Sequence, residues 1–372
     1  MGDNITERRR LTRNRMYRLI YDAEIGISKQ QIANEMECSM PTVHQNIAEL
    51  LEANLIKQGE FQPSSGGRPA IGYVINSELK IAIGVSLSTR HIRFLAVDMK
   101  LRENASDKVS AEYESLEKSG KQIADKLEKF IDKSGIDRKK ILGVGITMPA
   151  VIDNTKGVIV VSPTLNIKNA SLDILTKHIS YPVFVENDGT CAGAAEAFGS
   201  KESDFAYLFM EYGIGGAIYA NGQLIKGQNG RSAEFGHICV HPGGLKCSCG
   251  KKGCLEAYCG ALRYTKDLGI TAEEFFAELE NGNEDYKKLW NDVLNHLTIG
   301  INNIRMMFDS KVILGGFVSE YLEPYLPKLK AYVASKNTFE EDGSYISLGK
   351  FYKKGGMMGG ASYFIKKYIE EL

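Results

Sequence analysis

The chain lacks any long apolar run. None of its stretches approaches the roughly 18–20 apolar residues that a membrane-spanning helix needs, so no membrane partner is expected. The first residues carry Asp3, Glu7 and several arginines where a signal peptide would have an apolar segment. Net charge is also absent, because 46 Lys and Arg balance 46 Asp and Glu. Attraction of the whole molecule to nucleic acid is therefore not expected, and any DNA binding needs a local basic patch.

Cysteines are few, and their number is odd. Seven cysteines in 372 residues do not form a disulfide framework and indicate a reducing, cytoplasmic location. The hydrophobic fraction of 43% and the charged fraction of 25% are typical of a globular protein. The length is sufficient for two or three domains.

Three of the cysteines follow a C-x-C-x₄-C pattern, with a histidine upstream. Gly250 and Gly253 permit tight turns that let three thiolates converge. Zinc takes three thiolates and one imidazole in a tetrahedron, and a closed set of four ligands is structural. We predict one structural zinc ion, Zn²⁺, per chain; the alternative is a set of unrelated free cysteines. The expected ligands are His237, Cys247, Cys249 and Cys254.

The first seventy residues have the pattern of a helix-turn-helix. Residues 8–18 hold six arginines and no acid. Leu11, Met16, Leu19 and Ile20 follow them at helical spacing, which predicts an amphipathic helix whose basic face either binds DNA or is simply solvated.

Two shorter helices follow, with Ser28 and Ser39 as natural N-caps and Pro41 in a first turn. The second helix would present its N-terminal residues to base edges in the major groove of double-stranded DNA. Asn and Gln can pair with adenine, and Thr can contact a thymine methyl. A three-helix bundle that binds a protein is the alternative. The predicted reading residues are Thr42, His44, Gln45 and Asn46.

From Tyr73 onward, strands and helices alternate. Residues 81–86, 92–98 and 141–147 have the pattern of strands, and residues 120–134 that of a helix. The pattern continues with a strand ending at Val185, a helix over 189–198, strands at 205–211, 217–220 and 312–314, and a long helix over 289–308. Such alternation indicates α/β layers.

Several motifs resemble those of the ROK family of repressors and sugar kinases. Glu234-Phe-Gly-His237 is similar to its E-x-G-H signature, and residues 247–256 to its C-x-C-G-x-x-G-C-x-E signature. Glu186-Asn187-Asp188 resembles its E-N-D motif, residues 210–217 its second phosphate loop, and Leu314-Gly315-Gly316 its adenosine-side glycines. The resemblance covers about residues 73–372.

The resemblance implies an α/β fold: a two-lobed, actin-like (ribonuclease-H-like) ROK domain behind an α+β winged helix-turn-helix. We expect the winged domain and its linker at residues 1–72, one lobe at 73–188 completed by a C-terminal helix at 356–372, and the zinc-bearing lobe at 189–355. Leu55–Phe61 would be the first strand of the wing. Arg68, between glycine and proline, would enter an A·T-rich minor groove as in similar ROK repressors, unless the segment is only a linker.

The resemblance also assigns a sugar site. Carboxylates and amides recognise the hydroxyls of a sugar, and the residues that would do so are Asn187, Asp188, Glu234, His237 and Glu256. His237 would bind zinc through one ring nitrogen and donate from the other. Asp188 matches the base of the kinases. The alternative is that these are ordinary surface polar residues.

The two phosphate loops differ from those of the kinases. The stretch that matches D-x-G-G-T has Ser86, Ser88, Thr89 and Arg90 at its characteristic positions. The second loop has Glu211-Tyr212 in place of G-T, which puts a carboxylate that repels phosphate and a bulky phenol there. Phosphoryl transfer depends on positioning and charge stabilisation. We therefore expect no ATP binding, no enzymatic activity, and only a vestigial role for Asp188.

The resulting prediction is a sugar-responsive transcriptional repressor that binds operator DNA as a homodimer or homotetramer. The alternative is an ATP-dependent sugar kinase with an appended DNA-binding module. The sequence does not specify the sugar, the operator, or repression as against activation.

Overall fold

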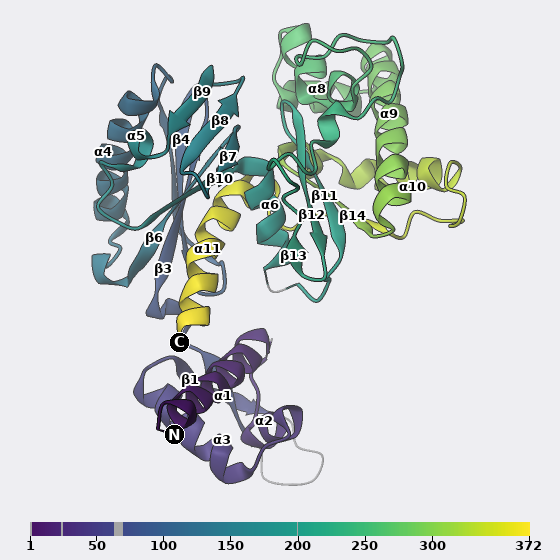
Figure 1. Ribbon diagram of the computed structural model, residues 1–372. Helices are drawn as coiled ribbons and strands as arrows, with labels where there is room; N and C mark the ends of the chain where they lie inside the picture. The colour runs from purple at the N-terminus through teal and green to yellow at the C-terminus, as the bar shows by residue number, and fades with distance from the viewer. Residues whose placement is uncertain (1, 24, 63–69, 199) are drawn as a thin grey trace.

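The computed structural model describes residues 2–23, 25–62, 70–198 and 200–372. It contains a small N-terminal domain and two α/β lobes that stand side by side above it (Figure 1). Among these residues, no helix combines the length and the apolar character needed to cross a membrane.

The N-terminal domain is a three-helix unit with a two-stranded wing. Its helices are α1 (Gly2–Asp22), α2 (Lys29–Met36) and α3 (Met40–Glu52). Strand β1 (Ile56–Gln62) pairs with β2 (Ala70–Ile75) in an antiparallel hairpin, as the predicted wing strand requires. The predicted caps are confirmed: the Ser28 side chain accepts the N–H of Gln31, and that of Ser39 accepts the N–H of Thr42.

The first lobe is built on a five-stranded sheet in the order β10-β6-β3-β4-β5. Its strands are β3 (Ile81–Leu87), β4 (His91–Asp98), β5 (Glu103–Ser110), β6 (Ile141–Met148) and β10 (Val183–Asn187). Helices α4 (Leu116–Ser134) and α5 (Asp173–Thr176) lie on its outer side, seen at the left of Figure 1. A three-stranded sheet of β7 (Val151–Asp153), β8 (Val158–Ser162) and β9 (Ile167–Ser171) completes this lobe.

The second lobe repeats that topology in the order β13-β12-β11-β14-β15. The strands are β11 (Phe205–Met210), β12 (Ile214–Ala220), β13 (Gln223–Leu224), β14 (Lys311–Gly315) and β15 (Ile346–Leu348). The helices are α6 (Asp188–Ala197), α7 (Leu255–Cys259), α8 (Ala272–Glu280), α9 (Glu284–Phe308) and α10 (Leu326–Ala334). In both sheets three consecutive strands are antiparallel, and two later strands add in parallel beside the first.

Helix α11 (Gly355–Glu371) runs from the junction of the lobes down to the N-terminal domain (Figure 1). Glycines let it approach its neighbours closely. A Cβ on Gly359 would lie 1.6 Å from the carbonyl oxygen of Cys191 on α6, and one on Gly145 of β6 would lie 2.2 Å from the backbone of Gly360. The helix is therefore in direct backbone contact with both the first-lobe sheet and α6.

The N-terminal domain packs on the other end of α11. The amide nitrogen of Asn14 donates to the carbonyl oxygen of Ile369 at 2.8 Å, and Arg13 donates to that of Leu372 at 2.7 Å. These contacts satisfy carbonyl groups that a helix C-terminus leaves unpaired. The Tyr21 ring packs edge-on against Phe198, with centroids 5.8 Å apart. The basic helix of the N-terminal domain is thus fixed to the C-terminus of α11.

Candidate functional site

A pocket lies where the two lobes meet, at the C-terminal end of β10. Residues 150–152 and 186–187 line one wall, and residues 215–217, 224–226, 230 and 232–234 line the other, with Thr190 of α6 between them. Of the predicted sugar-binding residues, Asn187 and Glu234 line this pocket.

Asn187 and Asp188 occupy the turn between β10 and α6. Asn187 caps α6, because its Oδ1 accepts the N–H of Thr190 at 2.9 Å while its Nδ2 donates to the carbonyl oxygen of Ala150 at 3.1 Å. Asp188 Oδ1 accepts the N–H of Gly189 at 2.9 Å. Burial raises the pKa of Asp188 to about 6, with a further upward contribution from the charge of Glu234. Such a carboxyl can accept a hydrogen bond from a hydroxyl near neutral pH.

A single 3₁₀ turn (Phe235–His237) follows Glu234 and ends at His237. The N–H of His237 donates to the Glu234 carbonyl at 3.1 Å. In that geometry side chains three residues apart lie one above the other, so the two predicted residues share a face. Glu256, on α7, is held by three contacts. Its Oε1 accepts from the Ser248 hydroxyl at 2.6 Å and lies 3.7 Å from the Cys247 sulfur, and its Oε2 accepts the Ile214 N–H at 3.2 Å.

An ion pair across the pocket was not predicted. The Glu186 carboxylate, whose side chain is 8% exposed, accepts from Lys226 Nζ at 2.8 Å and from Asn154 Nδ2 at 3.2 Å. Glu186 ends β10 in the first lobe, whereas Lys226 follows β13 in the second. Glu186 belongs to the quoted E-N-D motif, but no sequence pattern indicated Lys226.

The first phosphate-loop region forms a tight hairpin turn. The Ser88 hydroxyl donates to the carbonyl oxygen of His91 at 3.0 Å and accepts its N–H at 3.2 Å, which joins β3 to β4. The Ser88 side chain thus closes this turn, at a position that matches a glycine of the kinase motif.

In the second loop, Glu211 contacts the backbone beyond the Gly315–Gly316 pair. Its Oε1 accepts the N–H of Phe317 at 2.9 Å. Burial raises the pKa of Glu211 to about 8. The raised pKa favours the protonated carboxyl near neutral pH, so the expected repulsion of phosphate by a charged Glu211 is weakened there. Tyr212 does not fill the site as a buried group either: it is 58% exposed, with its ring 5.3 Å from that of Phe317.

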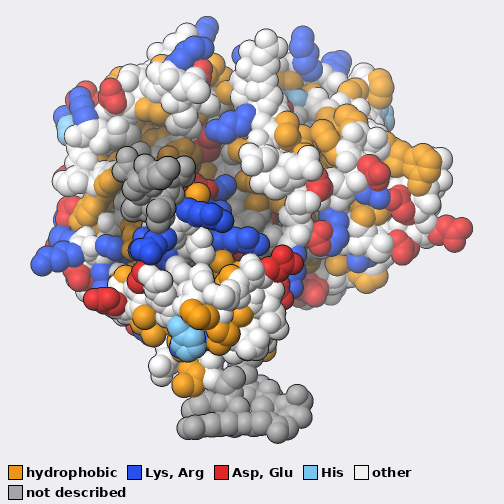
Figure 2. All heavy atoms as spheres, turned by 60° about the horizontal axis from the view of Figure 1, so that its bottom comes forward, with side chains coloured by type: hydrophobic (Ala, Val, Ile, Leu, Met, Phe, Trp, Pro, Cys, Tyr) orange, Lys and Arg blue, Asp and Glu red, His pale blue; other side chains and the backbone are white. Residues whose placement is uncertain are grey.

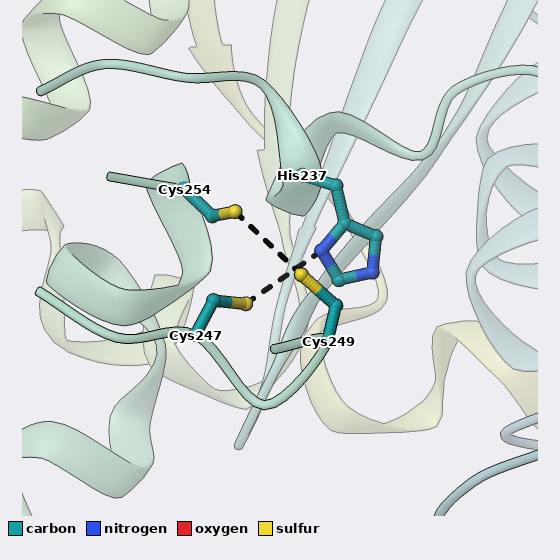
Figure 3. Close-up of side chains that lie close together, drawn as sticks. All are labelled: His237, Cys247, Cys249 and Cys254. Atoms are coloured by element: carbon teal, nitrogen blue, oxygen red, sulfur yellow. Dashed lines mark hydrogen bonds between the residues drawn. The ribbon is translucent and has the colours of Figure 1, made fainter. Parts of the chain in front are cut away.

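The predicted zinc ligands lie together. One ligand atom from each of His237, Cys247, Cys249 and Cys254 lies within 4.8 Å of the others. All four side chains point toward a common centre (Figure 3). Cys249 and Cys254 sulfurs are 3.7 Å apart, and Cys247 sulfur lies 3.8 Å from His237 Nδ1. Ligands about 2.3 Å from one ion at tetrahedral angles are about 3.8 Å apart, so the cluster fits a tetrahedral metal.

The glycine backbone allows the four ligands to converge, and the closeness of the thiols favours a bound cation. Gly250 and Gly253 have φ of +85° and +86°, and a Cβ on Gly253 would lie 2.0 Å from the carbonyl oxygen of His241. Burial and the neighbouring thiols raise the pKa of Cys254 to about 12, whereas the N–H of Lys251 lowers that of Cys249. Three thiols this close cannot all ionise without a cation, which is the role a metal would have.

In the N-terminal domain, α3 presents part of the predicted reading face. His44 and Gln45 are exposed and Thr42 is half-buried. Placing Asn46 on that face is wrong: it is 9% exposed, and its amide donates to the Thr42 carbonyl at 2.8 Å inside the helix. Leu11, expected on the apolar side of α1, is 59% exposed, because Asn14 and Tyr17 occupy the buried side instead. Arg68 lies outside the described residues.

The sequence profile of the ROK family matches residues 82–367, which is most of the chain. The chain belongs to the ROK family. A xylose repressor of Caldicellulosiruptor bescii is 26% identical over 339 residues, covering 84% of each chain. A glucokinase of Halalkalibacterium halodurans is 27% identical over 268 residues, covering 64% of this chain and 80% of the glucokinase.

Among solved structures, a ROK family transcriptional regulator described as a homologue of the E. coli MLC protein superposes with a TM-score of 0.76. Its sequence is 21% identical, and the match covers 97% of this chain and 96% of that one. This likeness confirms the predicted fold over nearly the whole chain, N-terminal domain included. The relatives thus include both a repressor and a glucokinase.

Proposed function

We propose that this ROK protein is a sugar-responsive, DNA-binding repressor of carbohydrate-utilisation genes that has lost kinase activity. The observation that supports the proposal is that carboxyl and amide groups of Asn187 and Glu234 line the interlobe pocket, while Ser88 and Glu211 bind backbone groups in the two phosphate loops. A chain with both features binds a sugar without phosphorylating it.

The sugar side offers mainly acceptors. Asp188, Glu234 and Glu256 supply carboxyl oxygens, and Asn187 is held rigidly by its backbone contacts. We propose that zinc is held by His237, Cys247, Cys249 and Cys254 as a structural ion. With Nδ1 turned toward the sulfurs, His237 keeps Nε2 as the nitrogen that can donate to a sugar hydroxyl. The chemical class recognised is therefore a neutral polyol.

The nucleotide side argues against ATP. A nucleotide held between the phosphate loops and the adenosine-side Gly315–Gly316 turn needs free backbone N–H groups there. Glu211 already occupies that of Phe317, and Ser88 closes the turn of the first loop. We attribute the proposed loss of phosphoryl transfer to these occupied backbone groups and not to charge repulsion.

A continuous set of contacts joins the sugar side to the N-terminal domain. Asp188 is the first residue of α6, and α6 meets α11 at the Gly359–Cys191 contact. The C-terminus of α11 is held by Asn14 and Arg13 of α1. We propose that sugar binding shifts the lobes, that α11 moves with them, and that the N-terminal domains of a dimer or tetramer lose their operator spacing.

The basic surface for DNA lies on the N-terminal domain. Figure 2 turns the N-terminal end of the molecule toward the viewer. A band of lysine and arginine side chains runs across the face seen there. Arg8, Arg9, Arg10, Arg15 and Arg18 of α1 are exposed, although the chain as a whole carries no net charge. These arginines are candidates for phosphate contacts, and α3 and Arg68 for base and minor-groove contacts.

The test is a pair of assays on the full-length protein. Duplexes selected from a random pool should bind tightly, and one sugar of a panel should both raise the melting temperature and release the DNA. A ligand at 100 times its Kd adds about 2.7 kcal/mol to the free energy of unfolding. The kinase alternative predicts instead sugar-dependent ADP release that Asp188→Asn abolishes, and that result would reject the proposal.

A further inference from the structure

His44, the exposed histidine of α3, has a hydrogen-bond partner within the protein at its Nδ1 atom. Lys29 Nζ, at the start of α2, lies 3.0 Å from Nδ1 of His44. The lysine is half-buried, with its ammonium 5.7 Å from the centroid of the buried Tyr73 ring. Its position is thus set by the domain core, whereas His44 projects toward the solvent.

This contact fixes the proton of the imidazole. A lysine ammonium has three donors and no acceptor, so Nδ1 of His44 must be the acceptor. A neutral imidazole with an accepting Nδ1 carries its proton on Nε2. His44 is therefore a hydrogen-bond donor through Nε2.

The next residue, Gln45, is oriented so that it offers a hydrogen-bond acceptor. Gln45 Nε2 donates to Glu49 Oε1 at 3.2 Å, and Glu49 in turn lies 3.9 Å from the Arg13 guanidinium. Glu49 takes one of the two amide hydrogens and so fixes the orientation of the amide, which leaves the carbonyl oxygen as an acceptor available to DNA. Adjacent exposed positions of α3 thus offer a donor and then an acceptor.

We propose that Lys29 is a positioning residue that makes His44 select a guanine, and reject a cytosine, in the operator. The inference rests on the proposed DNA-binding function. Guanine presents two acceptors, N7 and O6, in the major groove, whereas cytosine presents the N4 amino donor. A donating Nε2–H matches the first and faces the hydrogen of the second. The other tautomer would have the opposite preference.

The tautomer is tested on the DNA-free protein. Long-range ¹H–¹⁵N correlation spectra of ¹⁵N-histidine-labelled protein distinguish Nε2–H from Nδ1–H, and His44→Gln assigns the signal among the six histidines. Wild type and Lys29→Arg should show Nε2–H at His44. Lys29→Met, which keeps the apolar stem over Tyr73, should show a mixture. An Nδ1–H or doubly protonated His44 in the wild type overturns the proposal.

Base preference is tested by selecting duplexes from a random pool with the same proteins. At the base pair facing His44, the wild type and Lys29→Arg should prefer guanine over cytosine by about tenfold or more. Lys29→Met should reduce this ratio to about twofold while the pair facing Gln45 keeps its preference, which serves as the internal control.

Two outcomes separate the inference from the function on which it rests. If Lys29→Met weakens binding to all sequences equally and reduces the salt dependence, Lys29 is a phosphate contact and the positioning role is wrong. If the wild type selects no sequence, the proposed function fails, and the base-reading role of His44 fails with it, whatever tautomer the spectra show.

Discussion

Replacing Glu211 by glutamine should stabilise the protein, and the gain should increase with pH. Burial in the second phosphate loop raises the pKa of Glu211 from 4.5 to about 8, and the nearby Asp188 adds to the rise. Below about pH 4.5 both the folded and the unfolded chain hold the proton, and the stability contribution of Glu211 is complete. As the pH rises toward 8, only the unfolded chain releases the proton, so this stability is lost.

The size of the effect follows from the pKa values. At about 1.4 kcal/mol per unit of pKa difference, the loss is about 1 kcal/mol at pH 5.5 and about 4 kcal/mol at pH 8. Glutamine has no proton to release and retains an oxygen that can accept the Phe317 N–H. The free energy of unfolding of Glu211→Gln minus that of wild type should therefore increase by about 3 kcal/mol between pH 5.5 and pH 8.

Urea unfolding of both proteins at four or five pH values measures this difference. The exposed Glu341→Gln is the matched control for the removal of one carboxyl far from the pocket. A difference that stays flat with pH, or a variant less stable than wild type at pH 8, would mean that Glu211 is ionised in the folded protein. Charge repulsion would then again be the reason for the proposed loss of nucleotide binding.

Three further results are expected. Cys254→Ser should reduce bound zinc well below one per chain and weaken the sugar response, since the His237 imidazole loses its fixed orientation; full zinc content measured by atomic absorption in this variant would contradict the ligand set. Asn14→Ala should cost about 1 kcal/mol of stability and uncouple sugar binding from DNA release, measured by anisotropy with a fluorescent operator; normal release would exclude the α1–α11 junction as the route. Gln45→Ala should relax preference at one base pair, whereas Arg68→Ala should reduce affinity mainly for A·T-rich minor grooves; equal losses on all sequences would contradict this division.

Local chemistry was readable from the sequence. The serine caps of α2 and α3 act within three residues of themselves, and the C-x-C-x₄-C spacing with its glycines defines a ligand loop in which only His237 comes from outside. Hydrophobic alternation likewise identified the central strands of both lobes and the long helix α9. The departures of the two phosphate loops from the kinase motifs are visible as substitutions of single residues.

Side-chain environment within one helix was less predictable. Asn46 is polar and follows the exposed Gln45 in the sequence, yet its side chain is buried and donates a hydrogen bond to a carbonyl of its own helix. The helical period alone does not say how far the apolar side extends, because that depends on the width of the surface against which α3 packs. The charge state of Glu211 has the same origin, since burial determines its pKa.

Only the tertiary structure decided which distant residues meet. Glu186 and Lys226 are 40 positions apart, Glu211 and Phe317 are 106 apart, and Asn14 and Ile369 are 355 apart. These pairs join one lobe to the other, one loop of the nucleotide side to another, and the basic helix to the C-terminus of α11. The sequence determined the chemistry that each segment carries, because capping, periodicity and ligand spacing act over a few residues. The tertiary structure determined which segments are partners, because such contacts depend on how the two sheets and α11 pack in three dimensions.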